Sequence, residues 1–287
     1  MQGKTCVITG ATDGIGKATA MGLAKMGASI VIIGRNQSHG DAARDEIRTN
    51  SHNPNVDFML ADLSSQSAIR QLAADIIARY RQVHVLINNA GISPTRRVET
   101  ADGIEATFAV NYLAPFLLTN LVLGRLIESA PARVVNVAGD YHRRASIQFE
   151  DLMSEKDYNY ARANNQAKLA LILFTYELAR RLTGTKVTAN CLHPGAVGTN
   201  GPLKDPNLSP YARFMYSLVK PFFLSPEKGA ATSIFLASSP EVQDVSGKYF
   251  IKQAPVASSP ASYDIPLAQR LWEVSAKLTG LDGAWQV

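Results

Sequence analysis

The chain contains little cysteine: among its 287 residues only Cys6 and Cys191 occur. Both lie in apolar runs that are typical of buried strands, where a cysteine packs as a small hydrophobe. We therefore expect neither a disulfide nor a reactive thiol. We also expect no metal site.

Long hydrophobic runs are scarce as well. The apolar stretches are of strand length or amphipathic, and we expect none to reach the roughly 18 apolar residues that a membrane span needs. A predicted strand begins directly after Met1-Gln2-Gly3-Lys4, which leaves no room for a signal peptide. We therefore expect a cytoplasmic protein with no membrane span.

Acidic residues are slightly outnumbered: the formal net charge is +5 and the pI is ≈ 9.2. The basic residues are scattered through predicted helices, and Arg143-Arg144 and Arg180-Arg181 are only pairs, not a stripe with interleaved aromatics. This distribution argues against a nucleic-acid partner. It indicates a solvated surface, with part of the excess serving an anionic cofactor.

Short β-branched runs alternate with longer helical patterns along the whole chain. This alternation, together with near-continuous apolar runs such as Ile30–Ile33, is typical of parallel strands buried between two layers of helices. The sequence predicts one α/β domain over residues 1–287, with a single Rossmann-type doubly wound parallel sheet of about seven strands and helices on both faces. The expected strands are Thr5–Thr9, Ser29–Gly34, Val56–Leu60, Val83–Asn88, Arg133–Val137, Val187–Leu192 and Lys248–Ile251. The expected helices are about Ile15–Met26, Ala42–Asn50, Gln66–Tyr80, Ile104–Ile127, Ala161–Leu182 and Pro226–Ala237.

Two connections are longer than a tight turn requires. Residues 140–160 separate a strand from its helix, and residues 195–225 are rich in aromatic side chains. Both follow the carboxyl ends of predicted strands, where doubly wound sheets bind ligands. We expect them to form the walls and the lid of a substrate site. In the alternative interpretation, the aromatic side chains only pack a loop or a subunit interface.

The first strand runs into the segment Gly10-Ala11-Thr12-Asp13-Gly14-Ile15-Gly16 and then into a helix. Glycines at this turn let backbone N–H groups approach a pyrophosphate, and the helix N-terminus favours its negative charge. The segment therefore predicts a dinucleotide site.

Arg35 and Asn36 follow the second strand. A cofactor that lacks a 2′-phosphate usually meets an acidic side chain at this position, which holds the ribose hydroxyls. An arginine favours the phosphate instead, so the sequence predicts NADP(H) rather than NAD(H). In the alternative interpretation, Arg35 is an exposed loop cation.

With the run Asn88-Asn89-Ala90-Gly91 after the fourth strand, these segments resemble the short-chain dehydrogenase/reductase family over nearly the whole chain. The resemblance implies that Asn89, Ala90 and Gly91 border the cofactor. Asp62 and Leu63 correspond to the family's adenine contact. Asn111 corresponds to its active-site asparagine.

The second half of the chain adds to this resemblance. His193-Pro194-Gly195 with Thr199 is similar to the segment that closes over the nicotinamide carboxamide, which implies that Pro194, Gly195 and Thr199 contact the cofactor. The ending, Arg270-Leu271-Trp272 with Leu278-Thr279-Gly280-Leu281, resembles the retinol-dehydrogenase-like branch.

The chemical centre departs from the family pattern. The family has a Tyr four residues before its catalytic Lys, on the same helix face, and a Ser after the fifth strand. Here Lys168 holds the lysine position, Asn164 stands four residues before it, and the strand continues as Ala138-Gly139. The family Tyr protonates the substrate oxygen, whereas an amide donates a hydrogen bond but gives up no proton near neutral pH. The family's bond from Lys168 to the nicotinamide ribose is retained in this interpretation.

Tyr141 is the leading hypothesis for a relocated acid or hydrogen-bond donor. If the chain stays extended after Gly139, side chains two residues apart project to the same side, which places Tyr141 on the face that position 139 occupies. In the alternative interpretation, Tyr141 lines the pocket or packs against Arg143. We interpret Asp140 and His142 as solvated loop residues.

Three functions are open at this point. The first is an atypical NADP(H)-dependent oxidoreductase that reduces a carbonyl, imine or conjugated alkene, with a proton from Tyr141, water or the substrate. The second is a non-redox biosynthetic enzyme, such as a cyclase, isomerase or pericyclase, in which Asn164, Tyr141 and Asn111 position a reactive substrate. The third is a non-catalytic NADP-binding pseudoenzyme.

The apolar lid region indicates a hydrophobic small-molecule substrate. The resemblance also implies a homodimer or homotetramer that pairs through the helices after strands four and five, and the apolar face Leu169–Phe174 permits such pairing.

Overall fold

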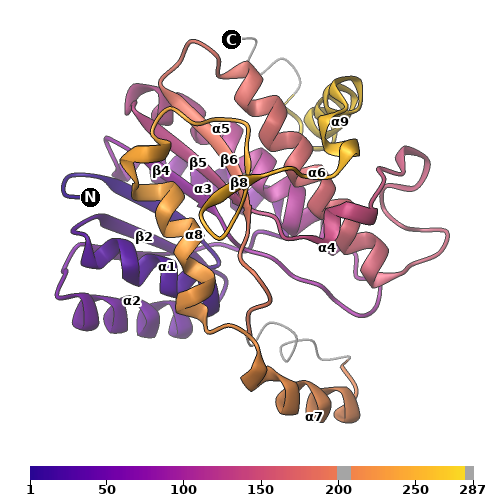
Figure 1. The fold of residues 1–287 in the computed structure, drawn as a ribbon, viewed down its shortest axis with the longest axis horizontal. Helices are drawn as coiled ribbons and strands as arrows, with labels where there is room; N and C mark the ends of the chain where they lie inside the picture. Colours follow the sequence, from indigo (N-terminus) through magenta and orange to yellow (C-terminus); the bar gives the residue numbers. More distant parts are fainter. Residues whose placement is uncertain (199–207, 282–287) are drawn as a thin grey trace.

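The computed structural model describes residues 1–198 and 208–281. Its centre is an eight-stranded sheet with the strand order β3-β2-β1-β4-β5-β6-β7-β8 (Figure 1). The strands from β3 to β7 run parallel, and β8 pairs antiparallel with β7. The strand order reverses between β1 and β4, which is where sheets of this type bind ligands. The strands are β1 (Thr5–Thr9), β2 (Ser29–Gly34), β3 (Val56–Leu60), β4 (Val85–Asn88), β5 (Ala132–Val137), β6 (Val187–His193), β7 (Tyr249–Ile251) and β8 (Ala254–Val256).

Helices cover both faces of this sheet, as the alternating pattern predicts. Successive residues of β1 point to opposite faces. Cys6 and Ile8 join an apolar cluster under α1, α2 and α8, and Val7 joins the cluster under α3, α5 and α6. The helices are α1 (Gly14–Lys25), α2 (Gln37–Ser51), α3 (Gln66–Arg79), α4 (Ala106–Phe108), α5 (Ala114–Glu128), α6 (Tyr160–Arg181), α7 (Pro210–Val219), α8 (Pro226–Ser238) and α9 (Ile265–Leu278). The doubly wound α/β fold class is thus confirmed.

Both cysteines pack inside these clusters. Cys6 and Cys191 are buried and free, and burial raises the pKa of the Cys6 thiol to about 12. The expectation that both cysteines pack as small hydrophobes in buried strands is confirmed.

The helical stretch Ala106–Glu128, which contains α4 and α5, corrects one expectation. It has the length and hydropathy of a membrane span, although the sequence analysis expected no segment to reach that length. However, 94% of its apolar window is buried inside the protein. Phe116, for example, packs against Phe174 and Trp272 with ring centroids 5.4 and 5.0 Å away. The stretch is therefore a core helix of the fold.

Helix α9 packs against α6, which carries the apolar face of the expected subunit contact. Its Trp272 ring lies 5.7 Å from the Phe174 ring of α6, and the Arg181 guanidinium lies 4.2 Å over Trp272. Residues Leu169–Phe174 are buried within the single chain. These residues are therefore not exposed in the single chain, and pairing through the helices after strands four and five stays a prediction.

Candidate functional site

The phosphate turn lies between β1 and α1, as the sequence predicts. Helix α1 begins at Gly14, and Asp13 caps it: Asp13 Oδ1 accepts a hydrogen bond from the Gly14 N–H at 2.7 Å. The next amides, of Ile15 and Gly16, belong to the first turn, where a helix has no acceptors of its own. This turn therefore presents N–H groups and a positive potential to an anion.

Two glycines of this turn are required by close packing. Gly10 has a φ of 63°, and a Cβ there would lie 2.8 Å from Ala90 Cα. A Cβ at Gly16 would lie 2.3 Å from the Gly10 carbonyl oxygen and 2.4 Å from Asn89 Nδ2. The turn therefore packs directly on the Asn-Ala-Gly run after β4, with room only for hydrogen.

Asn89 and Thr9 join these two segments. Asn89 Nδ2 donates to the carbonyl oxygens of Thr9 and Gly10 at 2.9 and 3.1 Å. Thr9 Oγ1 accepts from the backbone N–H groups of Asn89 and Ala90 at 3.0 and 3.1 Å. This role of Thr9 was not predicted from the sequence. A hydroxyl residue at the end of a buried strand could have indicated it.

Arg35 lies at the carboxyl end of β2 and is exposed. Within residues 1–198 and 208–281 its guanidinium has no hydrogen-bond or ion-pair partner. Its neighbour Asn36 instead caps α2, because Asn36 Oδ1 accepts from the N–H of His39 at 2.9 Å. A cavity of ≈ 260 Å³ opens between the first turns of α1 and α2, and its lining includes Thr12, Asp13, Lys17 and His39.

Asp62 and Leu63 follow β3 at the same edge of the sheet. Asp62 Oδ1 accepts from the N–H and hydroxyl of Ser64 at 2.9 and 2.8 Å, which fixes the turn, and Leu63 packs against the core. The predicted cofactor residues of β1, β2, β3 and β4 thus meet at one edge. The glycine turn, the amides of Ile15 and Gly16 and the unpaired Arg35 guanidinium are suited to bind a phosphorylated dinucleotide.

Asn111 lies in a π-helical turn, Ala109–Leu113, that the sequence analysis did not predict. Such turns often occur at functional sites. The Asn111 side chain exchanges two hydrogen bonds with the backbone of Ile92, both of 2.8 Å. A Cβ at Gly91 would lie 3.4 Å from Asn111 Oδ1 and 3.8 Å from Lys168 Nζ, so these three residues converge.

Asn164 joins this group. Asn164 Oδ1 accepts a hydrogen bond from Asn111 Nδ2 at 3.3 Å. Lys168 lies one turn later on α6, and its Nζ donates to the Val137 carbonyl oxygen at the end of β5, at 3.1 Å. Burial lowers the pKa of Lys168 to about 8. The structure therefore places an amide beside a partly desolvated ammonium group.

The chain does not stay extended after Gly139, so the reasoning that placed Tyr141 was wrong. Gly139 has a φ of 109°, Asp140 is helical, and a 3-10 turn spans Tyr141–Arg144. The Tyr141 ring is nevertheless near this position: its Cδ2 lies 3.7 Å from where a Cβ of residue 139 would be. The Tyr141 side chain is 63% exposed.

His142 is not a solvated loop residue, so the interpretation of this residue from the sequence was wrong. It is fully buried, its Nδ1 accepts from the Ser259 N–H at 3.2 Å, and its ring packs 4.9 Å from the Tyr249 ring. Burial is the main cause that lowers the pKa of His142 to about 4, so the imidazole is neutral at pH 7. Asp140 is partly exposed and pairs with Arg143 Nε at 2.7 Å.

The segment after β6 reaches the same edge. Pro194 and Gly195 follow β6, and a Cβ at Gly195 would lie 2.6 Å from Leu224 Cδ1. A β-bridge pairs Val197 with Leu224 two residues later. Thr199 lies outside the described residues.

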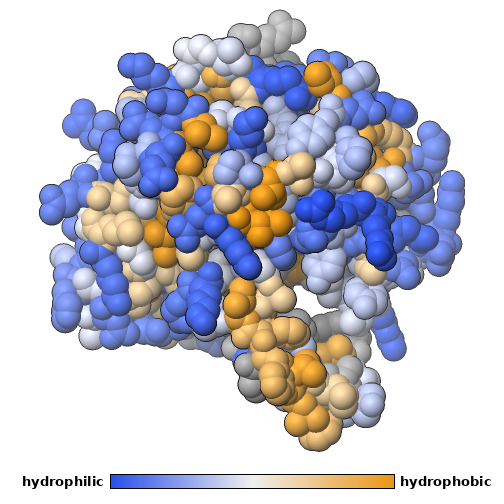
Figure 2. Space-filling view, viewed as in Figure 1, coloured by the Kyte–Doolittle hydropathy of each residue, from blue (hydrophilic) through white to orange (hydrophobic). Residues whose placement is uncertain are grey.

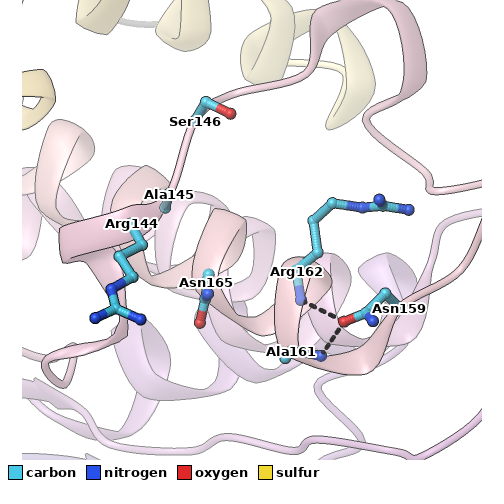
Figure 3. Close-up of a pocket in the computed structure, with 7 residues that line it drawn as sticks. All are labelled: Arg144, Ala145, Ser146, Asn159, Ala161, Arg162 and Asn165. Carbon is cyan, nitrogen blue, oxygen red and sulfur yellow. Dashed lines mark hydrogen bonds between the residues drawn. The ribbon is translucent and has the colours of Figure 1, made fainter.

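A second cavity, of ≈ 360 Å³, lies beside the start of α6 (Figure 3). Arg144 and Arg162 line it, but their side chains point to opposite sides, and Asn159 is turned toward the helix to cap it (Figure 3). Residues of the stretch 140–160 thus border this cavity. Its lining also includes Asn165, which follows Asn164 in the sequence. The diverging cations form no common anion site.

Comparisons with known proteins agree with this geometry. Residues 4–204 match the model of the family described as short chain dehydrogenase. Retinol dehydrogenase 12 of Bos taurus is 43% identical over 279 residues, which cover 97% of this chain and 87% of that protein. Retinol dehydrogenase 13 of Homo sapiens is 42% identical over 290 residues, with 98% and 86% covered.

Solved structures show the same fold. An uncharacterized protein from Mycobacterium Paratuberculosis aligns with a TM-score of 0.77 and 30% identity over 97% of this chain and 94% of that chain. A short chain dehydrogenase from Burkholderia cenocepacia J2315, solved in complex with NADP, aligns with a TM-score of 0.67 and 25% identity over 87% and 96%. The sequence match, the sheet order and the glycine turn all agree, and the chain belongs to the short-chain dehydrogenase family.

Proposed function

We propose that the chain is an NADP(H)-dependent oxidoreductase that acts on a hydrophobic small molecule without the Ser and Tyr pair usual in its family. The substrate is a carbonyl, an imine or a conjugated alkene. The observation that carries the proposal is the contact of Asn111 Nδ2 with Asn164 Oδ1 at 3.3 Å, one helical turn from Lys168. It puts an amide where the family has a phenol.

The cofactor preference rests on the unpaired Arg35 beside the phosphate turn. A guanidinium presents several N–H donors to a phosphate, which an acidic side chain at this position would repel. The amides that begin α1 would receive the pyrophosphate, and Lys168 Nζ would hold the nicotinamide ribose, as the resemblance to the family implies. When bound, NADPH supplies the hydride.

Asn164 acts in this proposal as a hydrogen-bond donor to the substrate. Its Oδ1 is taken by Asn111, and within the described part of the chain its Nδ2 has no acceptor. An amide held in this way is aimed in advance at a carbonyl oxygen or an imine nitrogen, where charge develops during hydride transfer. It stabilises that charge but donates no proton.

The reduction needs one proton for each hydride. The hydride adds to the carbonyl or imine carbon, or to the β-carbon of a conjugated alkene, and the proton goes to oxygen, to nitrogen or to the α-carbon, respectively. Tyr141 is the proposed donor because its ring lies 3.7 Å from the Cβ position of residue 139, where the family has its Ser. Its exposure lets it exchange protons with water.

The proposed substrate class rests on the relatives. Two relatives with about two fifths of their residues identical to this chain are named retinol dehydrogenases. We therefore propose an elongated hydrophobic substrate of the retinoid type, for which all-trans-retinal is a suitable probe because its aldehyde is conjugated to a polyene.

The test is the oxidation of NADPH with all-trans-retinal and a panel of hydrophobic enones and imines. Tyr141→Phe is expected to lower kcat by at least about a hundredfold, since general acids contribute roughly that much. Tyr160→Phe, an exposed tyrosine on α6, is the matched control. Unchanged turnover in Tyr141→Phe excludes the phenol as donor. Conversion of substrate without consumption of NADPH contradicts the redox proposal.

A further inference from the structure

Exposed hydrophobic side chains are concentrated on one projecting segment, residues 208–224, which we call the apolar arm. It contains eight of the seventeen large hydrophobic side chains that are exposed in the described part of the chain. Phe222 is 88% exposed, Tyr211 74% and Phe214 60%. Single exposed hydrophobic residues are ordinary, but a contiguous group marks an interaction surface. In Figure 2 this segment is the apolar projection at the bottom of the molecule.

The helix of the arm presents these residues along one face. Tyr211, Phe214, Met215 and Leu218 in α7 follow the spacing i, i+3, i+4, i+7, so they lie on one side of the helix. The short 3-10 turn Lys220–Phe222 continues from the end of α7 and adds Phe222. The face is rich in aromatic rings, which favour the boundary between lipid and water.

The base of the arm is fixed to the protein beside the edge of the sheet where the predicted cofactor residues meet. The Leu224 N–H donates to the Ala196 carbonyl oxygen at 2.9 Å, and the Gly198 N–H donates to the Leu224 carbonyl oxygen at 3.0 Å. From this base α7 projects away from the sheet (Figure 1). The arm therefore holds an apolar face at a distance from the core, where the fold does not bury it.

The charges on the arm have one sign. Between Asp205 and Glu227 the sequence holds Arg213 and Lys220 and no acidic residue. The whole chain is also basic, with a net charge of +5. A second copy of the chain, paired across a two-fold axis, would bring these cations against each other. An anionic lipid surface instead offers acyl chains to the rings and phosphate or carboxylate groups to the cations.

We propose that the apolar arm inserts its aromatic face into an anionic lipid surface. In this arrangement the arm lies flat in the headgroup region. Its base stays beside the edge of the sheet where the predicted cofactor residues meet. The proposal does not depend on the reaction that the site performs, because it concerns only where the protein lies.

The test is flotation of the full-length protein with vesicles. Protein is expected to float with vesicles of phosphatidylcholine and phosphatidylserine, less with phosphatidylcholine alone, and less again at high salt. Replacing Phe214→Ser and Phe222→Ser together is expected to weaken binding by at least about tenfold, since two rings no longer enter the lipid. Replacing Arg213→Gln and Lys220→Gln is expected to weaken only the phosphatidylserine-dependent part, by roughly tenfold.

The matched control is Met26→Ser, which removes a side chain of 44% exposure outside the arm and is expected to leave flotation unchanged. The replaced phenylalanines are exposed, so the variants are expected to keep the thermal midpoint and the circular dichroism of the parent protein. The proposal is overturned by the absence of flotation with either vesicle, or by equal flotation of the phenylalanine variant. A concentration-dependent dimer that the phenylalanine variant abolishes, without flotation, assigns the face to a second copy and also overturns it.

Discussion

In the proposed function Asn164 stands where the family has a tyrosine, and the two side chains differ in what they can give to a substrate. Both side chains donate a hydrogen bond, but only a phenol releases a proton. The sequence predicted the replacement from the spacing to Lys168. It did not predict the contact with Asn111, because that contact depends on the π-helical turn, which brings Asn111 toward α6.

Replacing Asn164→Tyr therefore restores one missing acid. The variant is expected to reduce all-trans-retinal with NADPH at least about tenfold faster than the parent chain, since general acids add that much or more. Steady-state oxidation of NADPH measures the gain. Asn165→Tyr, at the neighbouring position, is the control and is expected to show none. A folded Asn164→Tyr variant without any gain contradicts the assignment of this position.

In the same proposal position 139 stands where the family has a serine, and a serine is harder to introduce there than a tyrosine at position 164. Gly139 has a φ of 109°, and its carbonyl oxygen accepts from the Tyr249 hydroxyl at 3.0 Å. A serine in this conformation costs on the order of 1–3 kcal/mol of backbone strain. The backbone conformation at position 139 thus favours glycine, which the residue type alone does not reveal.

The pKa of Lys168 gives a prediction that needs no substrate. Burial lowers its pKa to about 8 in the folded protein, whereas an unfolded chain titrates near 10.4. Between these values the folded state binds fewer protons, so this lysine's contribution to stability rises with pH and is lost as pH falls through about 8. Relative to Lys168→Met, the parent protein is therefore expected to gain stability from pH 8 to pH 10.

Urea unfolding of the cofactor-free proteins over this pH range measures the difference between parent and variant. Its slope should stay below about 1.4 kcal/mol per pH unit, the limit for one group. If the difference in unfolding free energy between the parent protein and Lys168→Met is constant with pH, the Lys168 amine is not desolvated.

The phosphate turn shows how an element depends on its neighbours. The sequence predicted the strand, turn and helix from the glycines, and β1 and α1 occur within a residue of the expected bounds. It did not predict that Gly16 packs on Asn89, because that contact joins segments 73 residues apart in the chain.

Replacing Gly16→Ala tests this packing. The added Cβ meets the Gly10 carbonyl oxygen and Asn89 Nδ2, and overpacking of this kind costs about 1–3 kcal/mol. NADPH binding, measured by the quenching of protein fluorescence, is expected to weaken by roughly tenfold or more. Gly22→Ala on the same helix meets only the flexible end of Ile234 and is the control. Equal affinity of all three proteins contradicts the account of this turn.

There are physical reasons why β8 and α9 were not predicted from the sequence. Strand β8 follows β7 through Lys252 and Gln253, with φ angles of 49° and 65°, although Asn or Gly normally marks such a turn. Helix α9 did carry a signal, since Asp264 caps it and Pro266 lies in its first turn. Its partner face on α6 is defined only by the tertiary fold.

At the scale of the whole molecule, α9 decides which surfaces are free. It packs against α6, and its Ser275 hydroxyl lies 2.6 Å from the Tyr112 hydroxyl in the core. The apolar arm is on another part of the surface (Figure 1).

Light scattering of the purified chain is therefore expected to give a mass near 31.0 kDa in dilute solution. The physical reason is that the apolar residues Leu169–Phe174 of α6 are already buried within the single chain. A stable species of twice this mass, with cross-links between α5 and α6 of two chains, contradicts the prediction.

The central claim is that this chain transfers a hydride although its Ser and Tyr positions hold Gly139 and Asn164. The most direct measurement incubates the protein with all-trans-retinal and NADPH deuterated at the C4 position that donates the hydride, and follows the label by mass spectrometry. The account predicts one deuterium at the former aldehyde or alkene carbon of the product, with one NADPH consumed for each product formed. Product that carries no deuterium, formed while NADPH is retained, contradicts it.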